Sequence, residues 1–319
     1  MLLQITHTTT YHYTPQVNSA QHMAHLLPRT TPSQTVHRSE LTVDPAPATR
    51  RDAMDVYGNA RTFFSIPGAH AQLQLQAQSW VQTQPIALNE HALANWRAGS
   101  PAWEKVREHF RYHAGAQWDA ATEFSFASPH VQAHAEFANY ARASFTPQRP
   151  LLDAAVDLMQ RIHRDFEYAS QSTDVHTPAL QALSQRKGVC QDFAHIWLSC
   201  MRTLGLAARY VSGYVLTEPP AGQPRLIGSD ASHAWGSLYV PQSEGTGQWF
   251  DLDPTNNRWG LNTPGEDYVC LAWGRDFSDV SPLRGVIHGG ASHSLEVGVT
   301  VMPLDEKPSA ALKSACPQA

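Results

Sequence analysis

The sequence predicts an α+β fold, with an antiparallel β domain first, helices next and a second sheet last. Runs with the two-residue alternation of half-buried strands lie before residue 85. Apolar residues then recur at helical spacing up to residue 204, and strand-like runs return from residue 208 onward. A chain of 319 residues also suits about two domains.

Residues 1–85 are expected to form the β domain. The run from Leu3 to Tyr13 is rich in β-branched and aromatic residues, and Leu73 to Val81 alternates apolar with polar side chains. A turn signal lies between them, at Asp55 to Asn59. Such alternation predicts an antiparallel sheet with one buried face.

Residues 86–150 are expected to form a helical segment that connects two domains. Ser100-Pro101 and Ser128-Pro129 each place a capping residue before a proline, which favours a helix start. His130 and His134 have the spacing of a helical metal pair, but no third ligand of suitable type is spaced beside them. We therefore predict no metal site in this segment.

Residues 151–304 are expected to form the second domain. Apolar residues from Leu152 to Phe166 share one helical stripe, and a short helix should follow Thr177-Pro178. A buried helix of about four turns should begin at Cys190 and end before Gly205, a typical C-terminal cap. Strands are expected over residues 208–216, 233–240, 248–253, 268–273 and 295–302. Residues 305–319 mix Pro, Lys, Ser and Ala without a period, which predicts a flexible tail.

The composition excludes several classes of function. The net charge is −5, with 23 Lys plus Arg and no basic run, so nucleic acid is not an expected partner. No apolar run reaches ~18 residues and the N-terminus lacks the features of a signal peptide, which predicts a soluble cytoplasmic protein that does not bind membranes. The four cysteines are scattered, so reduced thiols are expected. The sequence carries no signal for an oligomeric state.

Cys190 is placed to act as a nucleophile. It heads the predicted helix, where free backbone N–H groups and the positive end of the helix dipole favour an anionic sulfur. The same N–H groups can hold the negative oxygen that forms when a carbonyl is attacked. Asp192 suits the first turn of this helix electrostatically, and Cys200, among apolar neighbours, is expected to be inert core.

His233 and Asp253 are predicted to lie on one face of a hairpin. If residues 241–245 form a five-residue loop, His233 lies opposite Asp253, and imidazole and carboxylate come within reach. A slip of one residue would place them on opposite faces. Asp251 lies on the same face two residues nearer the loop and is the rival for the carboxylate role.

The chain resembles the bacterial transglutaminase-like superfamily in four segments. These are Gly188 to His195, Arg209 to Tyr214, Asp230 to Trp235 and Phe250 to Asn257, in the order and spacing of that family. The opening region also resembles the N-terminal domain of bacterial members, and residues 274–285 are similar to their C-terminal extension. The resemblance implies a papain-like core, in which helices pack on an antiparallel sheet and carry a Cys-His-Asp triad.

Residue by residue, the resemblance implies that Cys190 is the nucleophile, His233 the general base and later acid, and Asp253 the carboxylate that orients His233. Tyr168 is a candidate for an additional oxyanion donor. No cofactor or metal is expected, and the sequence contains no calcium-loop motif of the kind that would point to a calcium-dependent enzyme.

These residues predict acyl transfer through a thioester on Cys190, with a peptide or protein amide as substrate. Hydrolysis is favoured, because water is always present and no amine-recognition motif can be read. One alternative is protein-glutamine cross-linking by the same triad. Others are a catalytically silent binding protein and a metal site built from Cys190, His195 and His233.

Overall fold

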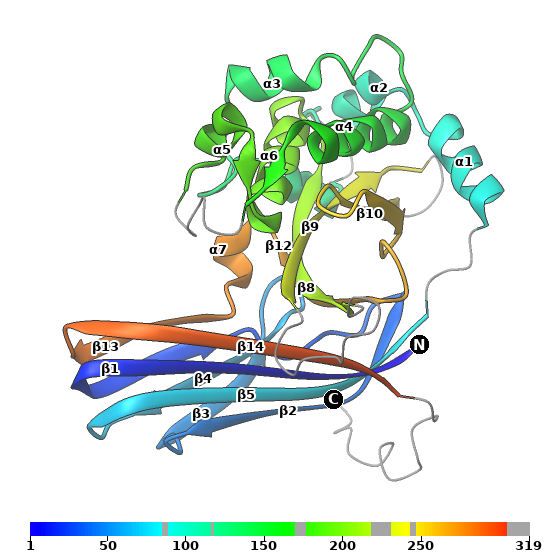
Figure 1. Ribbon diagram of the computed structural model, residues 1–319. Coiled ribbons are helices and arrows are strands. Elements are labelled where there is room, and N and C mark those ends of the chain that lie inside the picture. Colours follow the sequence, from blue (N-terminus) through cyan, green and yellow to red (C-terminus); the bar gives the residue numbers. More distant parts are fainter. Residues whose placement is uncertain (85–88, 116–117, 170–176, 218–230, 243–246, 305–319) are drawn as a thin grey trace.

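The computed structural model describes residues 1–84, 89–115, 118–169, 177–217, 231–242 and 247–304. A large sheet lies at one end of the molecule, a group of helices at the other, and a second sheet between them (Figure 1). The predicted α+β class is confirmed. The predicted tail, residues 305–319, lies outside the described residues.

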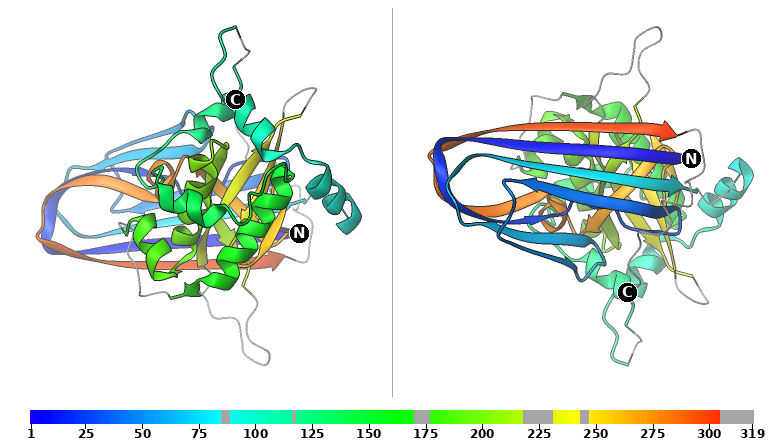
Figure 2. Two further views of the ribbon diagram at one scale, coloured as in Figure 1. Left: turned by 90° about the horizontal axis from the view of Figure 1, so that it is seen from above. Right: turned by 90° about the horizontal axis from the view of Figure 1, so that it is seen from below.

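The first sheet is built around one long strand, β1 (Leu2–Ala24). The first half of β1 pairs with β5 (His70–Thr83) and β14 (Ser292–Leu304), and the second half pairs with β4 (Ala60–Ile66) and β13 (Leu283–Gly289). β2 (Gln34–Asp44) pairs with β5, and β3 (Thr49–Met54) pairs with β4. Figure 2 shows β1 and the β13–β14 hairpin bending together at one end of this sheet.

The placement of β13 and β14 corrects the sequence-based grouping. Residues 283–304 were expected to complete the second domain, but both strands pair with β1 at the other end of the chain. Alternation shows that a strand is half-buried and does not identify the sheet that accepts it. The strands β2, β3, β4, β11 and β13 were not anticipated individually from the sequence.

The second sheet has five antiparallel strands in the order β11-β10-β9-β8-β12. Their bounds are β8 (Ala208–Val215), β9 (Ala231–Val240), β10 (Gln248–Asp253), β11 (Arg258–Leu261) and β12 (Tyr268–Gly274). Gly236 on β9 lets helix α6 (Cys190–Thr203) approach, because a Cβ there would lie 2.4 Å from the ring of Trp197.

The remaining helices are α1 (Glu90–Gly99), α2 (Trp103–His109), the 3-10 helix η1 (Ala120–Ser125), α3 (Ala135–Ala141), α4 (Leu151–Asp165), α5 (Ala179–Gln185) and α7 (Phe277–Val280). Of these, α3, α4, α5 and η1 contact α6, α1 and α2 contact α4, and α7 contacts β12 and β8 (Figure 1). Trp197 Nε1 donates to the carbonyl of Ala155 at 3.3 Å and ties α6 to α4. Among the described residues, no helix is long and apolar enough to cross a membrane.

Helix α3 begins later than Ser128-Pro129 predicted. Ser128 and Val131 instead form an isolated bridge, and the N–H of His130 donates to Asp276 at 2.7 Å. Because these backbone groups find partners outside a helix, the helical turn starts only at Ala135.

Two side-chain amides join the first sheet to the free edge of β12. Gln34 exchanges hydrogen bonds of 2.7 and 2.8 Å with the backbone of Cys270. Asn59, from the predicted turn, does the same with the backbone of Trp273 at 2.7 and 3.0 Å. Each amide replaces the missing strand partner, so the two sheets are held in one orientation.

Candidate active site

Cys190 is the first residue of α6, as the sequence predicted. Val189 before it is extended, and its N–H donates to the Asp192 carboxylate at 2.8 Å, which caps the helix. Gly188 makes room for that carboxylate, since a Cβ there would lie 2.7 Å from it. The Cys190 side chain is partly buried and is a free thiol.

His233 lies between Cys190 and Asp253. Its Nε2 donates to Asp253 Oδ2 at 2.7 Å, and the Cys190 side chain lies near enough to raise the pKa of the imidazole. Because Nε2 is taken by Asp253, Nδ1 is the nitrogen left for the sulfur. Burial lowers the pKa of His233, but the interactions with Asp253 and Cys190 outweigh it and raise this pKa to about 10. The imidazole is therefore protonated at neutral pH.

Asp253 is fully buried and surrounded by donors. Tyr268 donates to Oδ2 at 2.7 Å, Asn256 Nδ2 donates to the same oxygen at 2.8 Å, and the N–H of Thr255 donates to Oδ1 at 2.8 Å. Burial raises the pKa of this carboxyl, but the bonds from His233, Tyr268 and Asn256 keep it below its usual range. The Asp253 carboxylate therefore stays ionised and accepts a hydrogen bond from the protonated imidazole of His233.

The register of the hairpin differs from the prediction. Val240 pairs with Gln248 and Gly236 with Leu252, so the connection spans residues 241–247 and the register moves by two residues. His233 is therefore diagonal to Asp253 and not opposite it. An even shift keeps both side chains on one face, and for this reason they still meet. Asp251 accepts instead from Trp235 Nε1 at 2.9 Å.

Asn256 and Tyr268 support the site but were not identified from the sequence. Asn256 follows Asp253 in an Asp-Pro-Thr-Asn turn, a pattern in which an Asp side chain commonly binds nearby backbone N–H groups. Tyr268 comes from β12, and no local pattern connects it with Asp253. Arg258, the first residue of β11, also forms an ion pair at 2.7 Å with Asp267, which lies just before β12.

A cleft of about 640 Å³ opens beside His233. Thr255 and Asn256 line it, as does Tyr168 from the two-residue strand β6 (Glu167–Tyr168). β6 pairs in parallel with β7 (Lys187–Gly188), directly before the helix start. The pKa of Tyr168 is raised by burial and by the charge of Cys190, so its hydroxyl is a protonated donor close to the sulfur.

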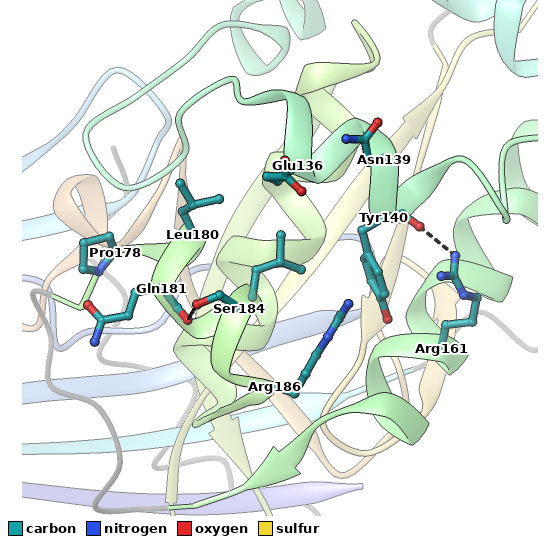
Figure 3. A pocket seen from close by; sticks show the side chains of 10 residues that line it. Glu136, Asn139, Tyr140, Arg161, Pro178, Leu180, Gln181, Ser184 and Arg186 are labelled. Carbon is teal, nitrogen blue, oxygen red and sulfur yellow. Dashed lines mark hydrogen bonds between the residues drawn. The ribbon is translucent and has the colours of Figure 1, made fainter.

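A larger hollow of about 920 Å³ lies between α3, α4 and α5 (Figure 3). There the guanidinium groups of Arg186 and Arg161 approach the ring of Tyr140 at 4.3 and 4.5 Å. Arg161 Nη1 also donates to the Tyr140 carbonyl at 2.9 Å. His233 lines the cleft of about 640 Å³ but not this hollow, so the larger volume does not make the hollow the reacting site.

His195 lies away from the cleft. Its ring stacks on His130 with 5.1 Å between centroids, and its Nε2 accepts from the N–H of Phe277. Burial lowers the pKa of His195 to about 3, so the ring is neutral and serves to join α6 to α7. Within the described residues, no group of three His, Cys, Asp or Glu side chains is arranged to hold a metal ion.

Two family models match the chain. Residues 3–82 match the bacterial transglutaminase-like N-terminal region, and residues 138–254 match the transglutaminase-like superfamily. The uncharacterized protein Rv2569c of Mycobacterium tuberculosis is 38% identical over 95% of this chain and 93% of its own length. The uncharacterized protein ML0607 of Mycobacterium leprae is 28% identical over 95% of this chain and 99% of its own length.

Among solved structures, the chain is similar to a putative cysteine protease from Cytophaga hutchinsonii. The TM-score is 0.69 at 21% identity, and the match covers 97% of this chain and 93% of that one. This likeness shows that the two share a fold. Given both family models and the relatives matched over nearly their whole length, the chain belongs to the transglutaminase-like superfamily.

Proposed function

We propose that this protein hydrolyses amide bonds in peptides or proteins through a thioester on Cys190. The observation that carries the proposal is the position of His233, which donates to Asp253 at 2.7 Å and lies near enough to Cys190 for the cysteine to raise its pKa. A thiol, an imidazole and a carboxylate in this order form a nucleophile, its acid-base partner and an orienting anion.

In the first step the anionic sulfur of Cys190 attacks the amide carbonyl carbon. The C–S bond forms, and the carbonyl oxygen becomes negative. Backbone N–H groups at the start of α6 and the hydroxyl of Tyr168 are the donors that hold this oxygen. His233 then gives its Nδ1 proton to the nitrogen, the C–N bond breaks and the amine leaves.

In the second step water resolves the thioester. The now neutral His233 takes a proton from water while the oxygen attacks the carbonyl carbon. The C–S bond breaks, the carboxylic acid leaves, and the thiolate and imidazolium are restored. Amide and water are consumed, and amine and acid are produced.

The cleft supports water as the acceptor. It is open beside His233 and carries polar lining groups such as Thr255, Asn256 and the Arg258–Asp267 pair. An amine would react by the same route if the cleft held it in place of water, which is the cross-linking reaction.

The test uses peptides that contain glutamine, asparagine and ordinary backbone amides, incubated with and without a fluorescent primary amine and followed by mass spectrometry. We expect cleaved or deamidated peptides that appear with wild-type protein and disappear with Cys190→Ala. Amine incorporation as the main product would show a transferase instead. Unchanged peptides with folded, fully reduced protein would contradict both forms of the proposal.

We further propose that the protein works in the cytoplasm. Cys190, Cys200 and Cys270 are all free thiols, which persist in a reducing compartment. Fractionation of the producing cells should recover the protein with soluble cytoplasmic markers. Recovery with periplasmic or envelope markers would contradict this assignment.

A further inference from the structure

A further cavity, of about 240 Å³, lies where the first sheet meets the second. Thr31 and Pro32 line it on the side of the first sheet, and Arg209, Asp251 and Trp249 line it on the side of the second. None of its lining residues lines the cleft beside His233. The cavity is therefore a separate place in the molecule.

Two buried, oppositely charged side chains face this cavity. Arg209 on β8 and Asp251 on β10 both pair with Ser237 of β9, so they lie in one row across the sheet. They are only 7% and 3% exposed. Asp251 Oδ2 accepts from Trp235 Nε1, and Ser237 and the charge of Arg209 also stabilise this carboxylate. Among the described residues, Arg209 Nε has no hydrogen-bond partner. A buried cation with an unpaired N–H is costly, so a polar ligand in the cavity would add a missing partner.

The guanidinium of Arg209 is held in one orientation. Its central carbon lies 4.0 Å from the ring of Trp249 and 3.8 Å from the ring of Trp273, and Arg29 covers the other side of Trp273 at 3.3 Å. Rings on both faces leave only the edge of the guanidinium, with its N–H groups, for a ligand. The donor edge is thus preorganised before anything binds.

We propose that this cavity binds a small zwitterion of the α-amino acid class. The carboxylate would accept from the edge of Arg209, and the ammonium group would donate to Asp251 Oδ1. The indole walls suit a short apolar side chain. The neighbouring thiol of Cys270 does not compete for the ammonium group, since burial raises its pKa to about 12 and keeps it neutral.

The space and the charges favour this class of ligand. A cavity of 240 Å³ has room for an amino acid the size of serine together with a few waters. Arg209 and Asp251 already offset each other's charge, so a ligand with only one charge would add a net charge to this buried site. A zwitterion satisfies both and adds no net charge to a buried site.

The test is calorimetric titration of the Cys190→Ser protein with glycine, L-alanine and L-serine, and with acetate and methylamine as one-ended analogues. Binding is thus separated from any hydrolysis. We expect at least one amino acid to bind about tenfold or more tightly than either analogue, because charged hydrogen bonds at both ends are required. Equal affinity for acetate would overturn the zwitterion assignment.

Variants then locate the site. Asp251→Asn should weaken binding about tenfold or more by removing the anion that faces the ammonium group. Thr31→Phe should block the cavity from its rim, while the matched control Thr31→Val keeps the size of the side chain and should bind as the parent does. Thermal midpoints show whether each variant is folded. Amino-acid binding that survives both Asp251→Asn and Thr31→Phe in folded protein would contradict the location.

A crystal structure grown with the tightest-binding amino acid gives an independent readout. We expect the ligand between Arg209 and Asp251. Ordered water alone in the cavity at saturating amino acid would overturn the proposal.

Discussion

Tyr268 and His233 bind the same oxygen of Asp253, each at 2.7 Å. The tyrosine stabilises the carboxylate anion, and that anion in turn holds the imidazolium that faces Cys190. Three strands contribute to the arrangement: β12 carries Tyr268, β9 carries His233 and β10 carries Asp253. The geometry of the site therefore depends on how these three strands are arranged in the second sheet, as well as on the three triad residues.

Tyr268→Phe should destabilise the protein and shift its acid limit of activity. The substitution removes a buried hydrogen bond to a charged group, which contributes about 2 kcal/mol. Asp253 has a lowered pKa, so its contribution to stability is present above the ordinary pKa of an aspartate and is lost as pH falls through the lowered value. Without Tyr268 that loss should begin at higher pH, which urea unfolding and steady-state kinetics at several pH values will measure.

The control for this variant is Tyr239→Phe. Tyr239 is also on the second sheet, but its hydroxyl accepts from the N–H of Gly247, away from the triad. It should leave the acid limit of activity where the wild-type protein has it. Equal shifts for both variants would show that the effect comes from general loss of packing.

Asp253→Asn and Asp251→Asn distinguish the two carboxylates. Asp253→Asn should lower kcat by about 10⁴-fold, since it removes the anion that orients and charges the imidazole. Asp251→Asn should lower kcat far less, because Asp251 reaches His233 only through Trp235, whose ring lies 6.1 Å from the imidazole. Steady-state kinetics on one amide substrate compares them, and the reverse order would exchange the two roles.

His233 should set the alkaline limit of activity. Its pKa is raised to about 10, so the imidazolium that protonates the leaving amine should be lost only as pH rises through that region. The matching stability is fully present below the ordinary histidine pKa and disappears as pH rises through about 10. The difference in unfolding free energy between wild type and His233→Gln should therefore shrink between neutral pH and pH ~10.5. A constant difference over this range would contradict an imidazolium at this position.

Tyr168→Phe tests the oxyanion donor. Loss of one such donor typically lowers kcat by about 10²-fold or more, with little change in KM, because the donor acts on charge that develops during attack. Tyr168 is 55% exposed, so the substitution should hardly alter the thermal midpoint. A change confined to KM would assign Tyr168 to substrate binding alone.

Gly236→Ala tests how α6 is positioned. A Cβ at this residue would lie 2.4 Å from Trp197, so the helix that carries Cys190 has to move or the ring has to rotate. We expect a loss of about 1–3 kcal/mol in unfolding free energy and reduced activity. Gly99→Ala is the control, since nothing lies within 4 Å of a Cβ there. Equal stability of the two variants would show that the contact is loose.

The sequence predicted the parts of the site that depend on local pattern. Cys190 was recognisable because helical periodicity begins at that residue, and His233 because strand alternation runs on both sides of it. The hairpin register was wrong by two residues because composition alone did not show that Gly247 still belongs to the connection, where it binds Tyr239. His233 and Asp253 still share one face of the sheet, as predicted, because a register shift of two residues does not change the face of a side chain.

Features that depend on long-range contacts were not predictable. Tyr268 reaches Asp253 although β12 and β10 are not neighbours in the sheet, so no pairing rule connects the two residues. Pairing of the last strands with β1 was missed for a similar reason, since it joins opposite ends of the chain.

The most direct test of the central claim is the alkylation rate of Cys190 by iodoacetamide at neutral pH in the wild-type protein and in His233→Gln, followed by peptide mass spectrometry. The thiolate is the form of a cysteine that reacts, and the protonated imidazole of His233 is the cation placed to stabilise it. We predict rapid modification of Cys190 in the wild-type protein and a rate at least about tenfold lower in His233→Gln, while buried Cys200 and Cys270 stay unmodified. A rate that is unchanged in His233→Gln would contradict the account.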